Sequence, residues 1–518
     1  MFQWKRHSIG AAEWGHGELW DGVGLRRGSK CPGRFGGTVR RTKILATLGP
    51  VSSSLTEVRA LVRAGTNAVR LNCSHGSDEE HRAILRTAHA AFRREKIEGA
   101  VLVDVQGPKI RIGGLEPNPL TLRTGQSWSL YDRPRIGGAS GAYAQVPQLS
   151  RAARRGDPLL LGDGNVELRV LRVESHRVIT TVVHGGSVGS HAGLFLPAAR
   201  LATSVLEAKD RHDLDVVLAE GIDFLGLSFV RDVADVRLAR SELNRRPRGS
   251  EVGIIAKIER AEALEHIDEI LDAADGVMVA RGDLGIEVPL ERLAIEQKSI
   301  LRRAKLHGKL GIVATEMLLS MVHSPRPTRA EATDVANAVL DGADAVMLSE
   351  ESAVGEYPVE SIEWLDRICR AAEPELVRAG RPGELGEIAT PMRLEDSVAR
   401  GAVALASQLN ARAIVTPTHS GRTATWVARL RPSSRIVALS ARASTRRHLA
   451  LVWGVEARAV PARGDLLALT EWSRRALRST PSGSGPIVLT AGYPVEGRPT
   501  NLLMVVDPGP ANRERDPR

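Results

Sequence analysis

The feature that most constrains this chain is an alternation of short apolar runs with segments of helical periodicity, which begins at Lys43. Nearly every gap between two runs holds a helical pattern, and the clearest is residues 291–306. The runs are residues 43–48, 67–72, 101–105, 224–229, 252–259, 276–280, 311–315 and 343–349. Eight strand–helix units in one chain predict an α/β fold built on a (β/α)₈ barrel.

The segments outside this alternation divide the chain into further domains. Residues 1–38 have no period and predict a weakly ordered extension. The gap between the third and fourth runs is too long for one helix. Its turns and its apparent hairpin around Gly162-Asp163-Gly164 predict an inserted all-β lid, residues 109–193. The barrel is then expected to span residues 39–108 and 194–378.

A second strand–helix alternation follows the barrel. Pro and Gly in residues 373–391 indicate a linker. The pattern of residues 386–508 then predicts a C-terminal α/β domain, followed by a short charged tail at residues 509–518. The segment from Thr328 to Glu331 has the form of a helix-capping box.

Composition limits the class of protein and of partner. Hydrophobic residues make up 42% and aromatic residues only 3% of the 518 residues, as in a parallel sheet covered on both faces by helices. Half of the net charge of +10 lies in residues 1–41, and the rest is spread thinly, which argues against a nucleic-acid partner. No apolar run reaches the ~18 residues that span a bilayer, and three scattered cysteines suit a reducing compartment. We therefore expect a cytoplasmic protein with no membrane partner.

Polar residues follow several of the predicted strands at the ends where barrel active sites lie. Lys257 and Glu259 are two residues apart on one strand and so lie on the same side. Asp283 follows the next strand, and two carboxylates suit a bound Mg²⁺. Lys257 and Arg70 suit a phosphoryl group, whose charge spreads over three oxygens during transfer. Each motif alone has a plainer explanation, a solvated strand edge or a turn, and the prediction depends on their convergence.

Several strings of this sequence resemble pyruvate kinases, and the resemblance covers residues 39 to about 508. They are residues 42–52, 70–76, 104–111, 254–259, 275–287, 314–321, 325–358, 451–455 and 497–501. The order of Ala-Lys-Ile-Glu (256–259) and Met-Val-Ala-Arg-Gly-Asp-Leu-Gly (278–285) is the most specific part. The resemblance implies transfer of the phosphoryl group of phosphoenolpyruvate to ADP, a Mg²⁺ or Mn²⁺ cofactor, a homotetramer, and a sugar-phosphate or AMP effector.

The resemblance also implies roles for individual residues. Catalysis and substrate binding would involve Lys257, Arg70, Gly282, Asp283 and Thr315, and the divalent metal would be held by Glu259 and Asp283. The nucleotide would meet Arg111, Asn72 and His75. The monovalent-cation site would involve Asn72, Ser74, Asp104, Val105 and the position of Lys109, with Ser228 nearby. An effector phosphate would meet Thr418, Ser420, Gly421, Arg422 and Thr423, although an ordinary capped helix start explains this last segment equally well.

The sequence departs from the family pattern at three informative places. Lys109 stands where potassium-dependent members carry Glu, so we expect this chain to belong to the potassium-independent, Lys-type branch. Ala192 replaces a lysine that contacts the nucleotide in the family, and His191 is the candidate to compensate. Glu316 replaces a glutamine beside Thr315.

Two other functions remain open at this point. Other barrels that handle phosphoenolpyruvate or oxoacids, such as lyases and mutases, also hold Mg²⁺ with Glu and Asp, but they need no β lid over a nucleotide. A non-catalytic paralogue is supported only by the loss of the lid lysine at Ala192.

Overall fold

The computed structural model describes most of the chain. The described residues are 39–108, 110–146, 149–162, 164–195, 204–379, 393–462, 464–477, 485–493 and 499–507. The predicted N-terminal extension and C-terminal tail lie outside these ranges, as does Lys109.

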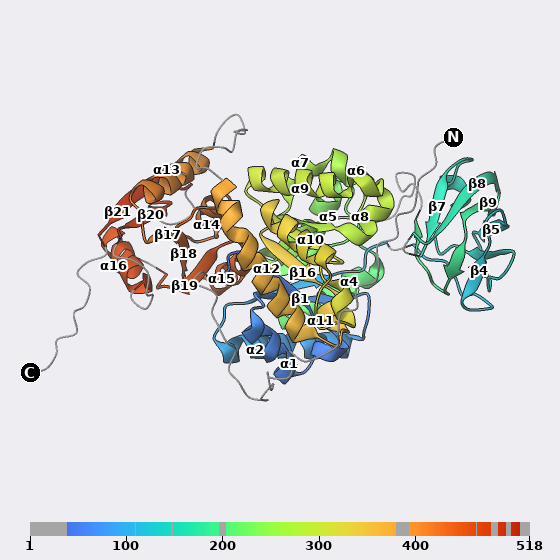
Figure 1. The fold of residues 1–518 in the computed structure, drawn as a ribbon, viewed down its shortest axis with the longest axis horizontal. Coiled ribbons are helices and arrows are strands. Elements are labelled where there is room, and N and C mark those ends of the chain that lie inside the picture. Colours follow the sequence, from blue (N-terminus) through green and yellow to red (C-terminus); the bar gives the residue numbers. More distant parts are fainter. Residues whose placement is uncertain are drawn as a thin grey trace, which may run out of the picture. The chain divides into compact units, whose positions relative to one another are not determined.

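Eight parallel strands close into a barrel, which confirms the predicted (β/α)₈ architecture (Figure 1). The strands are β1 (Lys43–Thr47), β2 (Ala68–Asn72), β3 (Ala100–Asp104), β12 (Phe224–Leu227), β13 (Gly253–Ile258), β14 (Gly276–Ala280), β15 (Leu310–Ala314) and β16 (Ala345–Leu348). Around the barrel they follow the order β1-β16-β15-β14-β13-β12-β3-β2. Nearly every strand residue is buried, because the barrel interior and the helices cover the two faces.

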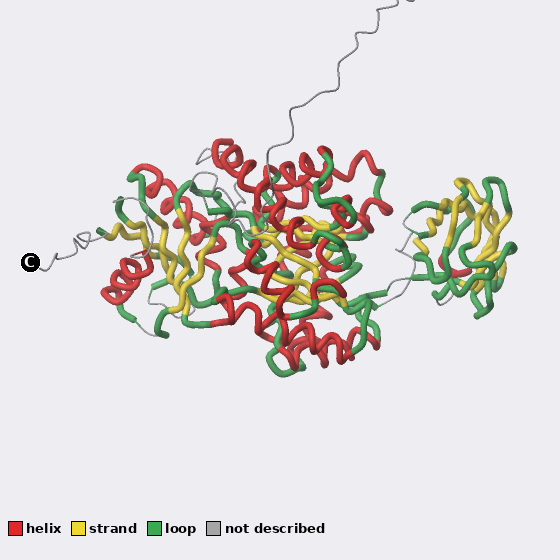
Figure 2. The backbone as a smooth tube through the Cα atoms, turned by 60° about the horizontal axis from the view of Figure 1, so that its bottom comes forward, coloured by secondary structure: helices red, strands yellow, loops and turns green. Residues whose placement is uncertain are grey.

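Helices between these strands surround the barrel (Figure 2). They are α1 (Leu55–Ala64), α2 (Asp78–Glu95), α4 (Ala208–Glu220), α5 (Val233–Asn244), α6 (Ala261–Glu265), α7 (Ile267–Ala273), α8 (Arg281–Glu287), α9 (Leu293–His307), α10 (Arg329–Leu340), α11 (Glu350–Ala353) and α12 (Pro358–Ala379). The capping box predicted at Thr328 is present, because Thr328 Oγ1 accepts from the backbone N–H of Glu331 and the Glu331 carboxylate accepts from that of Thr328. Helix α9 confirms the helix predicted at residues 291–306.

The insert between β3 and β12 is a β domain with its own hydrophobic core. Its strands are β4 (Leu120–Leu122), β5 (Ser127–Tyr131), β6 (Gly141–Tyr143), β7 (Pro158–Leu161), β8 (Val166–Glu174), β9 (Arg177–His184), β10 (Gly186–Val188) and β11 (Leu194–Phe195), with one short helix, α3 (Leu149–Ala152). Six strands form one curled sheet in the order β11-β7-β8-β9-β5-β6, and β10 pairs with β4. The predicted hairpin is β7 and β8, which pair with Leu161 opposite Val166.

The C-terminal domain is a five-stranded sheet with helices. Its elements are α13 (Leu394–Gln408), β17 (Ala413–Pro417), α14 (Arg422–Ala428), β18 (Arg435–Ser440), α15 (Ala443–His448), β19 (Val455–Ala459), α16 (Leu466–Leu477), β20 (Ile487–Ala491) and β21 (Leu502–Val506). Strand β21 is the only antiparallel member of this sheet among the described residues. None of the described helices is long and apolar enough to cross a membrane.

The linker prediction was wrong at its start. Helix α12 continues to Ala379 and contains Pro374, although a helical proline removes a backbone donor. Two tertiary contacts keep this turn helical. The carboxylate of Glu373 accepts from the backbone N–H groups of Arg41 and Thr42, and Leu376 is buried in the barrel core. Residues 380–392 lie outside the described ranges.

The barrel and the C-terminal domain share one hydrophobic core, and charged groups are buried at their junction. Arg431 is 4% exposed, and its Nη1 donates to Asp344 Oδ1 at 2.8 Å. Asp344 Oδ2 accepts from the backbone N–H of Gly311 at 3.0 Å. The guanidinium groups of Arg41 and Arg431 lie 5.2 and 4.8 Å from the ring centroid of the buried Trp453.

We predict that Arg431→Met destabilises the whole chain, because it leaves the Asp344 carboxylate buried without its cation. Breaking a buried pair in this way costs about 3–5 kcal/mol. The urea midpoint of unfolding should therefore fall, and it should recover in part when Asp344→Asn is added. Arg458→Met, which changes an exposed arginine of β19, is the control. An unchanged midpoint in Arg431→Met would show that this ion pair does not stabilise the junction.

Candidate active site

Four charged side chains, carried by β2, β3 and the end of β13, meet at the carboxyl end of the barrel. Arg70, on β2, donates from Nε and Nη2 to Asp104 Oδ2 at 2.9 and 2.8 Å. Lys257, on β13, places its Nζ 3.3 Å from the same oxygen and 2.7 Å from Glu259 Oε1. All four are almost fully buried, so the charges compensate one another in a region of low dielectric constant. The structure thus brings together Lys257 and Glu259, as their spacing predicted.

Neutral groups also form hydrogen bonds to the charged cluster. Thr47 Oγ1 accepts from Arg70 Nη1 at 3.2 Å, and Ser228 Oγ accepts from Lys257 Nζ at 3.0 Å. The backbone N–H of Phe229 donates to Glu259 Oε2 at 2.8 Å. Sequence reasoning missed Thr47 and Phe229. Thr47 occupies a strand position typical of any buried threonine, and a backbone donor carries no sequence signal.

The protonation of this cluster follows from its geometry. Burial opposes the charged form of Lys257, but the carboxylates of Glu259 and Asp104 raise its pKa above the ordinary value. Burial likewise opposes the charged form of Asp104, but Arg70 and Lys257 lower its pKa. Glu259 differs, because burial raises its pKa, the Lys257 ammonium offsets this only in part, and the negative charge of Asp283 raises the pKa further. A positive charge between Glu259 and Asp283 would relieve that repulsion.

These residues fit a hard divalent cation. Glu259 and Asp283 interact electrostatically, and carboxylate oxygens are the ligands that Mg²⁺ and Mn²⁺ prefer. The buried Asp104 Oδ1 has no hydrogen-bond partner. The neighbouring Gly226 is tightly fitted there, since a Cβ at this position would lie 1.9 Å from that oxygen. The mouth of the barrel therefore holds one carboxylate oxygen without a hydrogen-bond donor, beside two fixed cations.

Thr315 and Gly282 lie together at the ends of β15 and β14. The backbone N–H of Gly282 donates to Thr315 Oγ1 at 2.9 Å, and this hydroxyl donates to Ala314 O at 2.6 Å. Thr315 and Glu316 both have positive φ angles, 66° and 54°, which residues other than glycine rarely adopt. Arg281 Nη2 donates to Thr315 O at 2.6 Å. The segment from Arg281 is the first turn of α8 and not the turn that an Arg-Gly-Asp string suggests.

The residues predicted for the nucleotide and the monovalent cation follow β2 and β3. Asn72 Oδ1 accepts from the backbone N–H of Ser74 at 3.1 Å, and His75 O lies 2.6 Å from a ring nitrogen of His81. Val105 is buried, and its carbonyl accepts from Ser228 Oγ at 2.8 Å. The role of each residue stays a prediction, and so does that of Lys109.

In the β domain, Arg111 Nη1 donates to His191 O at 3.0 Å. Arg111 also forms a β-bridge with Gly193, the residue after Ala192. His191 has a left-handed backbone, with φ 62°. The two residues predicted to meet the nucleotide from the lid, Arg111 and His191, are therefore neighbours, and the missing lysine falls at the adjacent position, Ala192.

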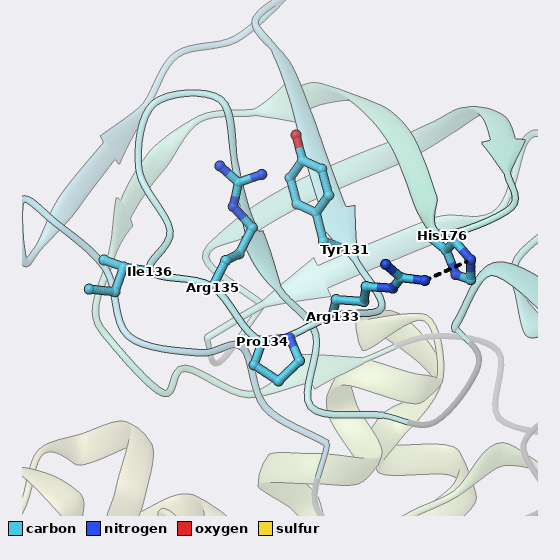
Figure 3. Close-up of a pocket in the computed structure, with 6 residues that line it drawn as sticks. All are labelled: Tyr131, Arg133, Pro134, Arg135, Ile136 and His176. Atoms are coloured by element: carbon cyan, nitrogen blue, oxygen red, sulfur yellow. Dashed lines mark hydrogen bonds between the residues drawn. The ribbon is translucent and has the colours of Figure 1, made fainter.

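The β domain also holds a cavity of about 380 Å³ that contains no predicted site residue (Figure 3). Arg135 lies over the ring of Tyr131, with its guanidinium carbon 4.2 Å from the ring centroid. Arg133 Nη2 lies 3.4 Å from His176 Nε2. The remaining lining residues are Pro134 and Ile136. The predicted catalytic residues lie at the barrel mouth and not in this cavity. The volume of a cavity therefore does not identify the catalytic site in this structure.

The predicted effector segment is a loop that leads into α14. Gly421 has φ 88°, and its N–H donates to Thr418 Oγ1 at 3.0 Å. Thr423 Oγ1 bonds to Thr500 Oγ1 at 2.8 Å. Ser420 and Arg422 are exposed. Helix α14 has seven residues. The two interpretations of this loop, an effector site and an ordinary helix start, both stay predictions.

Comparisons with known proteins match this architecture along most of the chain. The family model "Pyruvate kinase, barrel domain" matches residues 39–362, and "Pyruvate kinase, alpha/beta domain" matches residues 396–506. A pyruvate kinase of Agrobacterium vitis is 40% identical over 90% of this chain and 96% of its own length. One from Geobacillus stearothermophilus is 39% identical over 90% of this chain and 80% of its own length.

A solved structure agrees with the sequence comparisons. The crystal structure of a pyruvate kinase from Cryptosporidium parvum superposes with a TM-score of 0.84 at 32% identity, over 90% of this chain and 96% of that one. The matches include the barrel, which holds the charged cluster, and the C-terminal domain, in the order in which the structure has them. The chain therefore belongs to the pyruvate kinase family.

Proposed function

We propose that the charged cluster at the barrel mouth carries out the reaction of this family, in which the phosphoryl group of phosphoenolpyruvate moves to ADP and pyruvate is formed. The chain has pyruvate kinase activity, and the proposal concerns which residues perform it. The observation that carries it is the position of the Lys257 ammonium, which lies within 3.3 Å of both Asp104 and Glu259. A lyase or mutase is not favoured, because the match includes the C-terminal domain as well as the barrel.

Lys257 and Arg70 would bind the phosphoryl group during transfer. Its charge spreads over three equatorial oxygens, so two fixed cations stabilise the transition state. Asp104 holds both cations by one oxygen and so fixes their separation. A guanidinium has more N–H donors than the contacts of Arg70 use, which leaves donors for a phosphoryl oxygen.

Glu259 and Asp283 would hold the divalent cation, which when bound neutralises charge on the substrate oxygens as a Lewis acid. Gly282, in the first turn of α8, would lie beside the substrate carboxylate and help to position it. The Thr315 hydroxyl, held between Gly282 and Ala314, would position the proton that the enolate takes up when pyruvate forms. Arg111, Asn72 and His75 would contact the phosphates of ADP.

We also propose that activity does not require K⁺. The support is the sequence at Lys109, where a fixed ammonium replaces the carboxylate that potassium-dependent members carry. A homotetramer, a phosphate-bearing effector and a cytoplasmic location are further expectations from the family.

Replacing Lys257 with Met should lower turnover by roughly 10²–10³, the usual effect of removing one transition-state donor. A steady-state assay that measures pyruvate would give kcat and KM, and far-ultraviolet circular dichroism would check folding. Lys298→Met, which changes a half-exposed lysine of the outer helix α9, is the control. Near-normal kcat in a folded Lys257→Met protein would refute the assignment.

Glu259→Gln and Asp283→Asn should each raise the Mg²⁺ concentration that gives half-maximal activity, because each removes a charged oxygen ligand. The titration should be done at saturating substrates. Glu265→Gln removes an exposed carboxylate of the nearby helix α6 and should leave the midpoint unchanged. If neither variant moves the midpoint, the metal binds elsewhere.

The potassium proposal can be tested in K⁺-free buffer with a tetraalkylammonium salt at constant ionic strength. Added KCl should change the rate less than tenfold, and Lys109→Glu should create a potassium requirement. Asn72, Ser74 and Asp104 still offer oxygen ligands in that variant. Tenfold or greater activation of the unmodified chain by KCl would contradict the proposal.

A further inference from the structure

A second group of metal-ligating side chains lies on the outer helices, away from Glu259 and Asp283. Asp78 and His81 are on the first turn of α2, and Asp213 is on α4, which packs against it. One ligand atom of each lies within 4.8 Å of the other two. His81 and Asp213 are each only 2% exposed, whereas Asp78 is partly exposed.

The imidazole of His81 has one ring nitrogen without a hydrogen-bond partner. Its Nε2 lies 2.6 Å from His75 O, and since a carbonyl can only accept, Nε2 carries the proton. In the neutral ring, Nδ1 then carries the lone pair, and Nδ1 is buried without any hydrogen-bond partner. A histidine that binds a metal commonly donates its other N–H to a backbone carbonyl, which fixes the tautomer in this way.

The two carboxylates are balanced by side chains that a metal could displace. Lys209 Nζ donates to Asp213 Oδ2 at 2.7 Å, and His212 Nε2 lies 2.7 Å from Asp78 Oδ2. Neither contact uses Oδ1 of the aspartates. His212 is exposed and can release Asp78 at little cost, while Lys209 keeps a second acceptor, Cys73 O.

We propose that Asp78, His81 and Asp213 form a second divalent-metal site, separate from the catalytic one. One imidazole nitrogen and two carboxylate oxygens suit Zn²⁺, Mn²⁺ or Co²⁺ better than Mg²⁺, which prefers oxygen ligands alone. Bonds of about 2.0–2.2 Å would require the ligand atoms to draw closer, which side-chain rotation at the partly exposed Asp78 allows. The partly exposed Asp78 also gives the ion a path from solvent.

Metal binding here would act on the loop between β2 and α2. Helix α2 begins after this loop, and His81 and Lys209 hold its carbonyls at His75 and Cys73. An ion that joins α2 to α4 would therefore stiffen the segment that carries Ser74 and His75. The site itself does not depend on the roles proposed for those two residues.

The test uses the full chain, freed of metal by chelation, in millimolar Mg²⁺ so that the catalytic site is occupied. Zn²⁺ alone is titrated against a chromophoric chelator, and Co²⁺ is titrated by absorption spectroscopy. His81→Gln keeps a side-chain N–H donor for His75 O but removes the Nδ1 lone pair. Asp78→Asn removes a carboxylate at a partly exposed position, and Glu79→Gln removes a neighbouring exposed carboxylate as the matched control.

The unmodified chain and Glu79→Gln should bind Zn²⁺ with equal affinity in excess Mg²⁺. His81→Gln and Asp78→Asn should each weaken that binding by ~10-fold or more, since even outer partners of a ligand contribute 10–100-fold. Zn²⁺ should also raise the melting temperature of the unmodified chain but not of these two variants. Equal Zn²⁺ affinity in all four proteins, or none in the unmodified chain, would overturn the proposal. Should His81→Gln fail to fold, Asp78→Asn decides the matter.

Discussion

The charged cluster at the barrel mouth depends on the sharing of one carboxylate oxygen, Asp104 Oδ2, by the cations of Arg70 and Lys257. Two cations buried beside the same oxygen atom would repel each other strongly without an anion between them. Asp104 supplies that anion from the strand β3, which lies next to β2 in the barrel. The four charges therefore compensate one another without substrate, and the cations would not have to reorganise for the proposed phosphoryl transfer. Such preorganisation is the main source of electrostatic catalysis.

The division of the chain into cores suits this arrangement. The barrel and the C-terminal domain share one core, whereas the β domain packs around its own. A shared core makes the barrel strands, and so the spacing of Arg70, Asp104 and Lys257, resistant to local opening. The β domain, which carries Arg111 and His191, can keep its internal structure independently of the barrel. The rigid charged cluster and the separate core of the β domain both follow from the position of the insert, between β3 and β12.

Much of this fold could be predicted from sequence, because parallel strands buried on both faces leave continuous apolar runs. The two-residue spacing of Lys257 and Glu259 also predicted that both side chains lie on the same side of the strand. In the structure, Lys257 Nζ lies 2.7 Å from Glu259 Oε1. Contacts between distant residues could not be predicted. Nothing local in the sequence shows that Glu373 binds the backbone at Arg41 and keeps α12 helical through Pro374.

Backbone strain was equally hidden from sequence reasoning. Thr315 adopts a positive φ, which a β-branched residue normally avoids. It is held there by hydrogen bonds that include one from the N–H of Gly282, which joins the ends of the paired strands β14 and β15. The residue type alone predicts extended backbone at this position. Strain of this kind persists only where surrounding structure fixes it, and it is common at functional sites.

Several basic residues in the described part of the chain have a structural role. Loops at the carboxyl ends of the strands carry backbone carbonyls that no strand partner satisfies, and Lys and Arg offer several donors and no acceptor. Arg281 binds the carbonyl of Thr315, Lys209 that of Cys73, and Arg111 that of His191. Each cation fixes a segment that contains or adjoins a predicted site residue. These three cations therefore hold loops of the barrel and of the β domain in place.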